Sequence, residues 1–168
     1  FKRMWGAFGN TPIDAPPPAA RGTANTAPAQ PRALDTEGPG PQQFGTTHGI
    51  KVSNDGLVYV GDRDNRRIQV FTVDGKYVTQ VFVNRSGPSP AGVGGVAFSP
   101  DKDQQFMYLA DFGNSHVAVL NRKTLEVLYQ FGNRSANPGD FQGVHHLAVD
   151  SKGNLYTVET YEGRRLQK

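Results

Sequence analysis

The most constraining feature of this sequence is an internal repeat of just under fifty residues. Three tyrosines mark equivalent points of its copies, Tyr59, Tyr108 and Tyr156, which lie 49 and 48 residues apart. Each copy is a series of short apolar, β-branched runs separated by Asp-Gly, Lys-Gly or Asn-rich turns, as is typical of antiparallel strands joined by hairpins. Four strands in a period of this length predict one β-propeller blade per copy.

The composition favours the same all-β fold. With 20 Gly and 12 Pro among 168 residues, long helices are disfavoured and short strands with many turns are favoured. No apolar run approaches the roughly 18 residues of a membrane-spanning helix, so we expect no membrane partner. The net charge of +3 is small and the basic residues are scattered, so a nucleic-acid partner is not expected either.

The third copy has no outer strand at the expected place. Apolar runs predict inner strands at about 48–71, 94–120 and 145–168, and no further run follows the third set. Residues 1–9 resemble the segment that closes the second copy at Phe131-Gly132-Asn133. We therefore expect residues 1–9 to form the outer strand that closes the third blade.

Three blades leave a propeller ring open, so the strand count also predicts an assembly. Two copies related by a twofold axis would supply a six-bladed ring, and this is the commonest symmetry of soluble oligomers. We therefore expect a homodimer in which residues 1–9 complete the blade edge at 164–168, in the partner copy or in their own chain. The other interpretation is that the sequence is one half of a longer six-bladed chain.

Residues 10–43 differ in kind from the rest of the sequence. Most of the 12 prolines lie here, among Ala, Gly, Thr and Gln. Such a composition builds little core, so we interpret the segment as a linker or long loop between an outer strand and the next inner strand. It is either a lid over one face of the propeller or a disordered surface insert.

Two histidines hold the same place in their copies. His48 and His145 stand at the entrance of the first strand, beside the expected central channel, whereas the second copy has Gly94 there. Imidazoles that converge from several blades suit zinc or another divalent metal, and the alternative is that they pack at the channel mouth. We expect His146 to point away, between the blades, and His116 to have a structural role.

The loops between the second and third strands reach the same face as these histidines. Their Asp and Asn residues are interpreted as turn residues that bind the backbone, at Asp62, Asn65, Asp111 and Asn114. Arg63 and Tyr161 are not required by the turns, and the third loop is one residue longer than the first. These two side chains are therefore candidates for contact with a substrate.

Several of these motifs together strongly resemble the NHL repeat. They are His-Gly-Ile at 48–50, Asp-Gly-Leu-Val-Tyr-Val-Gly-Asp at 55–62, Asn-Arg-Arg-Ile-Gln-Val-Phe at 65–71 and Asp-Gly-Lys at 74–76. The resemblance covers residues 44–168. It implies a propeller of NHL-repeat blades, which are mostly arranged in rings of six.

The loops are further similar to those of the peptidyl-α-hydroxyglycine α-amidating lyases, a family of zinc enzymes. On this resemblance, His48 and His145 would bind zinc or another divalent metal. Arg63 would bind or polarise a carboxylate or carbonyl of the substrate, and Tyr161 would be the general base or nucleophile. Such a metal site could equally hydrolyse an ester, a lactone or a phosphoester.

Two classes of function are compatible with these patterns. One is a metal-dependent propeller enzyme, a lyase or hydrolase that acts on a small molecule or a peptide. The other is a non-catalytic NHL-repeat scaffold that binds protein or RNA. The absence of cysteine excludes thiolate chemistry and does not decide the compartment, for which we favour the periplasm or secretion over the cytoplasm.

Overall fold

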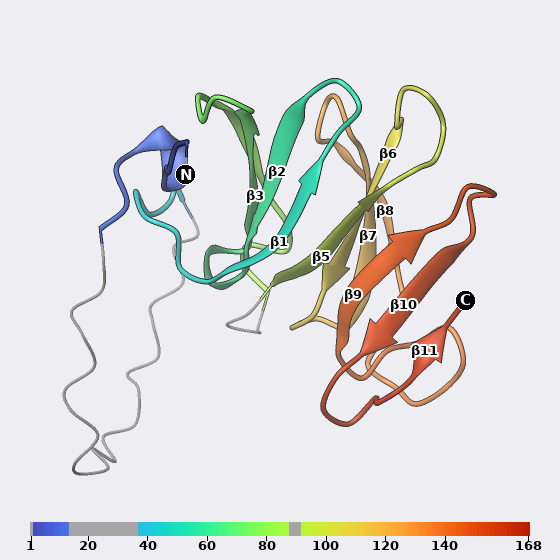
Figure 1. Ribbon diagram of the computed structural model, residues 1–168. Coiled ribbons are helices and arrows are strands. Elements are labelled where there is room, and N and C mark those ends of the chain that lie inside the picture. Colours follow the sequence, from blue (N-terminus) through green and yellow to red (C-terminus); the bar gives the residue numbers. More distant parts are fainter. Residues whose placement is uncertain (1, 14–36, 88–91) are drawn as a thin grey trace, which may run out of the picture.

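The computed structural model describes residues 2–13, 37–87 and 92–168, which form three antiparallel sheets arranged side by side like a fan (Figure 1). Within these ranges the helical elements are two 3-10 turns, Ala7–Gly9 (η1) and Arg63–Asn65 (η2). No helix of the described residues is long and apolar enough to cross a membrane. Each sheet is a propeller blade, and the predicted all-β propeller fold is confirmed.

The blades follow one another along the chain, and each begins with its innermost strand. Blade 1 consists of β1 (Thr47–Val52), β2 (Leu57–Asp62), β3 (Arg67–Thr72) and β4 (Tyr77–Phe82). Blade 2 consists of β5 (Val93–Phe98), β6 (Phe106–Asp111), β7 (His116–Asn121) and β8 (Val127–Phe131). Blade 3 consists of β9 (Val144–Val149), β10 (Leu155–Glu159) and β11 (Leu166–Gln167), and no fourth strand joins it among the described residues.

The inner strands β1, β5 and β9 lie next to one another, so closely that two positions have no room for a side chain. A Cβ atom on Gly49 would lie 2.5 Å from the carbonyl oxygen of Gly94. A Cβ atom on Gly94 would lie 2.4 Å from the carbonyl oxygen of His145. Both distances are shorter than any van der Waals contact, so the close approach of the strands requires glycine at both positions. One of them, Gly94, is the position at which the other two copies have a histidine.

Apolar side chains fill the spaces between adjacent blades. Because strand residues alternate between the two faces of a sheet, one in two can point at the neighbouring blade. The larger cluster, between blades 1 and 2, includes Tyr59, Phe98 and Met107. A smaller one, between blades 2 and 3, includes Val117 and Phe141. At roughly 25 cal/mol per Å² of apolar surface removed from water, this packing is what holds one blade against the next.

Residues 2–9 do not form the outer strand that the sequence predicts for blade 3. They cover part of the outward face of blade 1, where the ring centroids of Trp5 and Phe71 are 6.2 Å apart. A tight turn ends the extended segment, since the N–H of Gly6 donates to the carbonyl oxygen of Asn10 at 2.7 Å. Within this chain residues 2–9 form no strand of blade 3, and the partly buried ring of Trp5 packs on blade 1 instead. Pairing with the blade of a partner copy stays a prediction.

The described part of the proline-rich segment is bound to blade 1 by Arg67. Its completely buried guanidinium pairs with Asp62 at 2.9 Å and also donates to the backbone carbonyl groups of Pro39, Pro41 and Gln43. Residues 37–43 therefore pack with blade 1. The choice between a lid and a surface insert concerns residues 14–36, which lie outside the described residues.

Candidate metal centre

The inner strand of every blade contains a β-bulge at the same point. The ladder between β1 and β2 skips His48, and the ladder between β9 and β10 skips His145. The register of β5 shifts at the equivalent place, between Val93 and Val96. A bulge interrupts the alternation of side chains and re-aims the extra residue. Both histidines therefore stand outside the ladder of paired residues.

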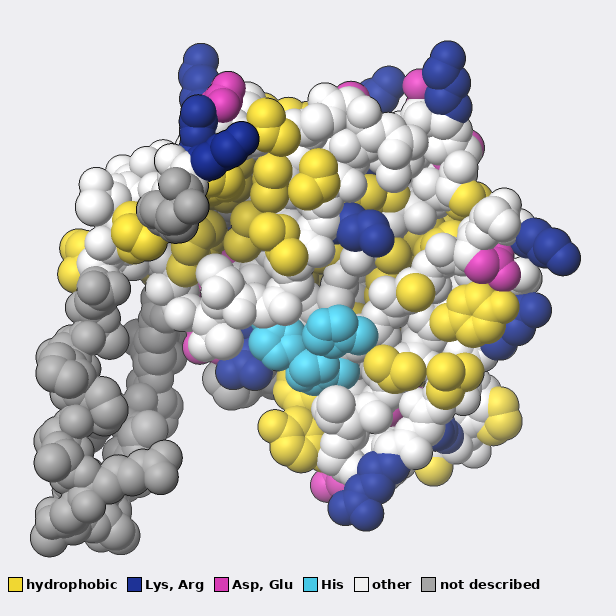
Figure 2. Space-filling view, viewed as in Figure 1, with side chains coloured by type: hydrophobic (Ala, Val, Ile, Leu, Met, Phe, Trp, Pro, Cys, Tyr) yellow, Lys and Arg dark blue, Asp and Glu magenta, His cyan; other side chains and the backbone are white. Residues whose placement is uncertain are grey.

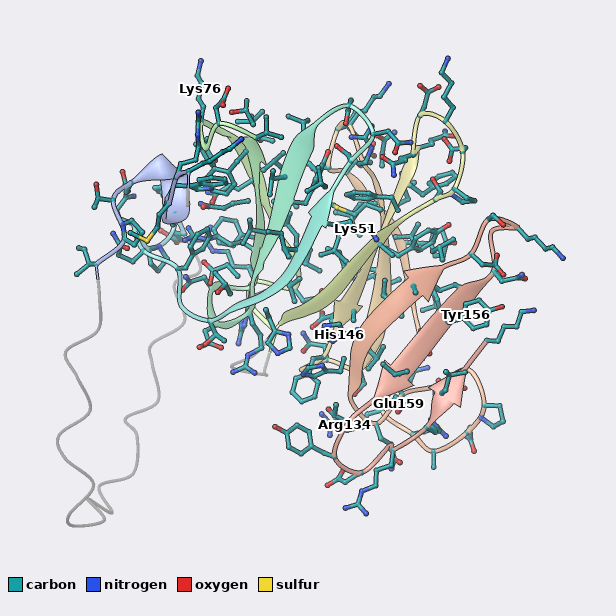
Figure 3. All side chains as sticks on the ribbon, in the orientation of Figure 1. Lys51, Lys76, Arg134, His146, Tyr156 and Glu159 are labelled. Atoms are coloured by element: carbon teal, nitrogen blue, oxygen red, sulfur yellow. The ribbon has the colours of Figure 1, made fainter. Side chains whose placement is uncertain are left out.

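The two histidines meet at one end of the inner strands, and His146 joins them. The ring centroids of His48 and His145 are 4.4 Å apart, and the Nδ1 atoms of His145 and His146 are 2.9 Å apart. One nitrogen from each of the three rings lies within 4.8 Å of the other two. Figure 2 shows the rings as one patch of the surface, and Figure 3 labels His146. We call this group the histidine cluster.

The expectation that His146 points away between the blades is wrong. It assumed strict alternation along β9, in which the side chains of consecutive residues lie on opposite faces. The bulge at His145 breaks that alternation, and the rings of His145 and His146 are stacked with their centroids 4.9 Å apart. Consecutive histidines can therefore serve the same site.

The surroundings of His48 and His145 favour the neutral form of both imidazoles. Burial is the main cause that lowers the pKa of His48, followed by the charges of Arg63 and His146, while Asp64 acts in the opposite direction. Burial also lowers the pKa of His145, followed by the charges of His48, His146 and Arg63. A neutral imidazole has a free lone pair, which is the form that binds a metal.

The geometry of the cluster fits a divalent metal of the size of zinc. Because Zn–N bonds are about 2.0–2.1 Å long, two nitrogens on one ion are at most about 4.2 Å apart. The three nitrogens, within 4.8 Å of one another, need only small side-chain movements to reach that spacing. In addition, the Nδ1 atom of His48 is buried without a hydrogen-bond partner among the described residues. A buried nitrogen without a hydrogen-bond partner is available to bind a metal.

Arg63 stands beside the cluster, at the start of η2. Its backbone N–H donates to the carbonyl oxygen of Thr46 at 2.9 Å, which fixes the turn against the beginning of β1. Its Nε atom is 3.0 Å from the carboxylate of Asp64. Arg63 therefore brings a positive charge close to two histidines. Its contact with a substrate stays a prediction.

Tyr161 lies further from the histidines than the sequence suggests, because it packs against Phe112, which in turn contacts His145. The centroid of its ring is 5.8 Å from that of Phe112, and the ring of Phe112 is 5.5 Å from that of His145. Tyr161 is on the protein surface, with 71% of the residue exposed. The structure thus gathers His48, His145 and Arg63, and it places Tyr161 behind Phe112, a residue that the sequence did not single out.

The other loop residues have structural roles, as predicted. The carboxylate of Asp62 accepts a hydrogen bond from Asn65 at 2.6 Å, and Asp111 accepts one from Asn114 at 3.0 Å. Glu159 replaces this aspartate at the end of β10, where Figure 3 labels it, and its side chain is completely buried. These acidic groups hold the loops and are not ligands of the cluster.

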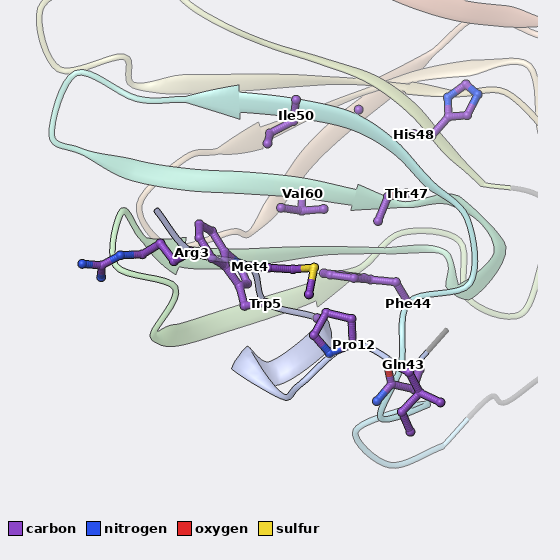
Figure 4. A pocket seen from close by; sticks show the side chains of 13 residues that line it. Arg3, Met4, Trp5, Pro12, Gln43, Phe44, Thr47, His48, Ile50 and Val60 are labelled. Carbon is purple, nitrogen blue, oxygen red and sulfur yellow. The ribbon is translucent and has the colours of Figure 1, made fainter. Parts of the chain in front are cut away.

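A groove adjoins the cluster on the outward face of blade 1 (Figure 4). Its volume is about 620 Å³. Apolar side chains of the N-terminal segment and of blade 1 line most of it, among them Met4, Trp5, Phe44 and Val60, and His48 lies at its margin. One member of the histidine cluster therefore borders an apolar surface that blades 2 and 3 do not cover.

Comparison with known proteins places this geometry in a class. The family model of the NHL repeat matches residues 46–71, which span β1 to β3. No curated protein sequence matches the chain. Together with the three blades, the match defines a β-propeller protein with an NHL repeat in its first blade.

Solved structures with the same fold are proteins of differing function. Hydrazine synthase of Kuenenia stuttgartiensis aligns over 68% of this chain with 14% identity and a TM-score of 0.55. A catalytically inactive histidine-to-alanine variant of virginiamycin B lyase from Staphylococcus aureus, solved with quinupristin, aligns over 71% with 18% identity and a TM-score of 0.54. A putative 6-phosphogluconolactonase of Bacteroides uniformis aligns over 71% with 18% identity and a TM-score of 0.56.

The chain spans only part of each of these structures. It covers 29% of the hydrazine synthase chain, 36% of the lyase and 35% of the putative lactonase. At these identities the likeness concerns the fold alone.

Proposed function

We propose that this chain carries the metal site of a propeller enzyme, a lyase or hydrolase that acts on a small molecule or a peptide. The observation that carries the proposal is the meeting of His48, His145 and His146 at the bulged ends of two inner strands, with Arg63 beside them. Structures of the same fold include a lyase and a putative lactonase, which is compatible with both reaction classes.

The residues of the site would divide the work as follows. The three histidines would hold the metal, preferably zinc, through their neutral nitrogens. When bound, the ion supplies Lewis acidity and activates water near neutral pH. Arg63 would bind a carboxylate or polarise a carbonyl of the substrate. Tyr161 would hold or accept a proton at the outer side of the site, where its ring packs against Phe112.

Metal binding is the direct test of this proposal. Zinc titration of the metal-free protein, followed by calorimetry and elemental analysis, should show tight binding of about one ion per histidine cluster. In the His48→Ala/His145→Ala double variant we expect the zinc affinity to fall by more than about 100-fold while the β-rich circular dichroism spectrum is kept. His116→Gln, at the histidine outside the cluster, is the matched control. Unchanged zinc binding in the double variant would refute the site.

The second candidate function is a non-catalytic scaffold. The outermost strand of blade 2, β8, favours it, because all of its residues are exposed and four are large and apolar: Val127, Leu128, Tyr129 and Phe131. An exposed apolar strand suits a protein partner better than RNA, which is bound chiefly through basic side chains. A protein that takes up no zinc and keeps its fold would favour this function over the enzyme.

We also propose that two copies of the chain associate through their open blade faces. Blade 1 exposes Ile50 and Val52 beside the groove, and blade 3 exposes Val158 and Leu166. Residues 2–9 lie over the outward face of blade 1, where the preceding blade would pack in a closed ring. Blade 3 of a second copy, which has no outer strand of its own among the described residues, fits that place. Such a dimer would bring two histidine clusters around one axis.

A further inference from the structure

Phe112 and Tyr161 form an aromatic wall beside the histidine cluster, next to His145. The ring of Phe112 meets that of His145 edge to face, at 5.5 Å and 83°, and the ring of Tyr161 follows at 5.8 Å. Neither ring belongs to the clusters of buried side chains between the blades. The aromatic wall, defined as Phe112 and Tyr161, is therefore part of the surface that a molecule at the cluster would touch.

The longer loop of blade 3 is what presents Tyr161. The loops of blades 1 and 2 each contain one non-glycine residue with positive φ, Arg66 at 53° and Ser115 at 59°. The loop of blade 3 contains two, Tyr161 at 55° and Arg164 at 45°. This conformation is unfavourable for a large side chain, and such strain tends to be kept where it serves a function. Packing does not explain it here, since the Tyr161 side chain is largely exposed.

Phe112 is held in place by contacts with two blades. Its backbone N–H donates to the carbonyl oxygen of Gly92 at 3.1 Å. Its ring covers Gly143, where an added Cβ atom would lie 3.3 Å from the ring carbon Cε2. Gly143 in turn accepts a hydrogen bond from the N–H of Thr160, next to Tyr161, at 3.1 Å. The wall is therefore formed before any ligand binds.

Arg63 supplies the complementary polar contact. Its Nε atom binds Asp64, and no hydrogen bond to its Nη atoms occurs within the described residues. A guanidinium presents its Nη groups to a carboxylate in a two-pronged arrangement. The charge of Arg63 acts on both His48 and His145, and His145 contacts the aromatic wall.

From this geometry we propose that the site binds aromatic carboxylates or aromatic acyl compounds. The flat ring of the ligand packs on Phe112 and Tyr161, and its carboxylate or carbonyl oxygen faces Arg63 and the histidine cluster. The proposal names the substrate class of the enzyme proposed above. It rests on that proposed function only for the reaction and not for binding. Binding itself depends on side chains that are present in the metal-free protein.

The test compares two probes, phenylacetate and acetate, on the full chain with and without zinc. Their dissociation constants are measured by calorimetry or ligand-observed NMR. We expect phenylacetate to bind at least about 10-fold more tightly, since each aromatic contact is worth roughly a 3- to 10-fold change in affinity. Phe112→Leu and Tyr161→Leu should each remove about that factor for phenylacetate and leave acetate unchanged. Arg63→Gln should weaken both probes.

Tyr129→Leu is the matched control, because this exposed tyrosine lies on β8, away from the cluster. Equal affinities for the two probes, or an unchanged preference in a folded Phe112→Leu variant, would overturn the aromatic wall. Zinc content is measured on the same samples. A protein that prefers phenylacetate but never binds zinc keeps the wall and loses the proposed metal enzyme, whereas zinc binding without the preference does the reverse.

Discussion

Gly94 occupies the position at which β1 and β9 carry a histidine, and the backbone of the neighbouring strand allows no other residue there. The carbonyl oxygen of His145 stands where a Cβ atom of residue 94 would have to be. The ligand residue and the glycine are therefore coupled, because β9 can present His145 only if β5 has no side chain at the contact. A histidine at position 94 would therefore not enlarge the cluster.

Replacing Gly94 with alanine or histidine should destabilise the protein. An added Cβ atom forces the inner strands apart, and overpacking of this kind costs about 1–3 kcal/mol or more. Urea unfolding measures the loss. Gly56→Asn serves as control, because the space around Gly56 is open and its positive φ is one that asparagine tolerates. A Gly94→His variant that unfolds like the wild type and binds zinc more tightly would contradict this account.

The stability of the turn between β9 and β10 depends on pH through the carboxylate of Asp150. Its carboxylate accepts hydrogen bonds from the side chain and backbone of Asn154, the backbone of Lys152 and the hydroxyl of Tyr156. These contacts, the Asn154 side chain first, lower the pKa of Asp150 to about 2, against about 4 in an unfolded chain. The unfolded state thus binds the proton more tightly, and the stabilisation is present above pH 4 and lost as the pH falls through about 2.

Asp150→Asn should therefore flatten the acid side of the stability profile. Unfolding free energies of variant and wild type, measured by urea titration from pH 6 down to about pH 2, are expected to converge as the pH falls. Tyr156→Phe, which removes one of the donors, should shift the profile in the same direction by a smaller amount. Parallel curves over the whole range would contradict a role for this carboxylate.

At the scale of the strands, the sequence predicts what depends on local pattern and misses what depends on neighbours. Alternating apolar residues and Asp-Gly turns locate the strands, because both act within a few residues. The bulge at His145 interrupts the ladder between β9 and β10, so the direction of His146 could not be predicted from alternation. Residues 2–9 have the composition of a strand, yet Trp5 packs partly buried on blade 1. That placement depends on a surface formed by residues far along the chain.

Arg67 connects strand β3 to residues 37–43, so its replacement should lower the free energy of unfolding. Arg67→Met leaves the buried carboxylate of Asp62 without its partner, which typically costs about 3–5 kcal/mol. It also releases residues 37–43, so limited proteolysis should begin there. Arg3→Met is the control, since the Arg3–Asp74 pair is exposed and worth about 0–1 kcal/mol. Similar urea midpoints for the two variants would show that the buried pair is not the anchor.

At the scale of the whole molecule, three blades expose two faces that a propeller ordinarily buries. The face of blade 1 is covered by residues 2–9 only in part, and the groove at its margin stays open next to Ile50. Apolar surface of this extent favours association. The proposed metal site and the proposed dimer would be linked, because His48 borders this groove.

The proposed dimer should be visible by sedimentation and by the fluorescence of Trp5, the one tryptophan of the sequence, which lines the groove. We expect twice the 18.3 kDa chain mass and an emission spectrum that changes on dilution. Ile50→Asp should give monomers, whereas Val127→Asp, on the rim strand β8, should not. A monodisperse wild-type monomer with a cooperative melt would refute the dimer.

The bulges of the inner strands separate two kinds of position. Where a bulge carries a histidine, as at positions 48 and 145, that residue contributes no paired contact to the ladder, so its side chain can be exchanged without changing how the sheet is held together. Gly94, at the same point of β5, has no such freedom, because the backbone of β9 leaves no room for a Cβ atom. Blades 1 and 3 can therefore lose a ligand by a single substitution and keep their fold, whereas blade 2 cannot gain one in the same way.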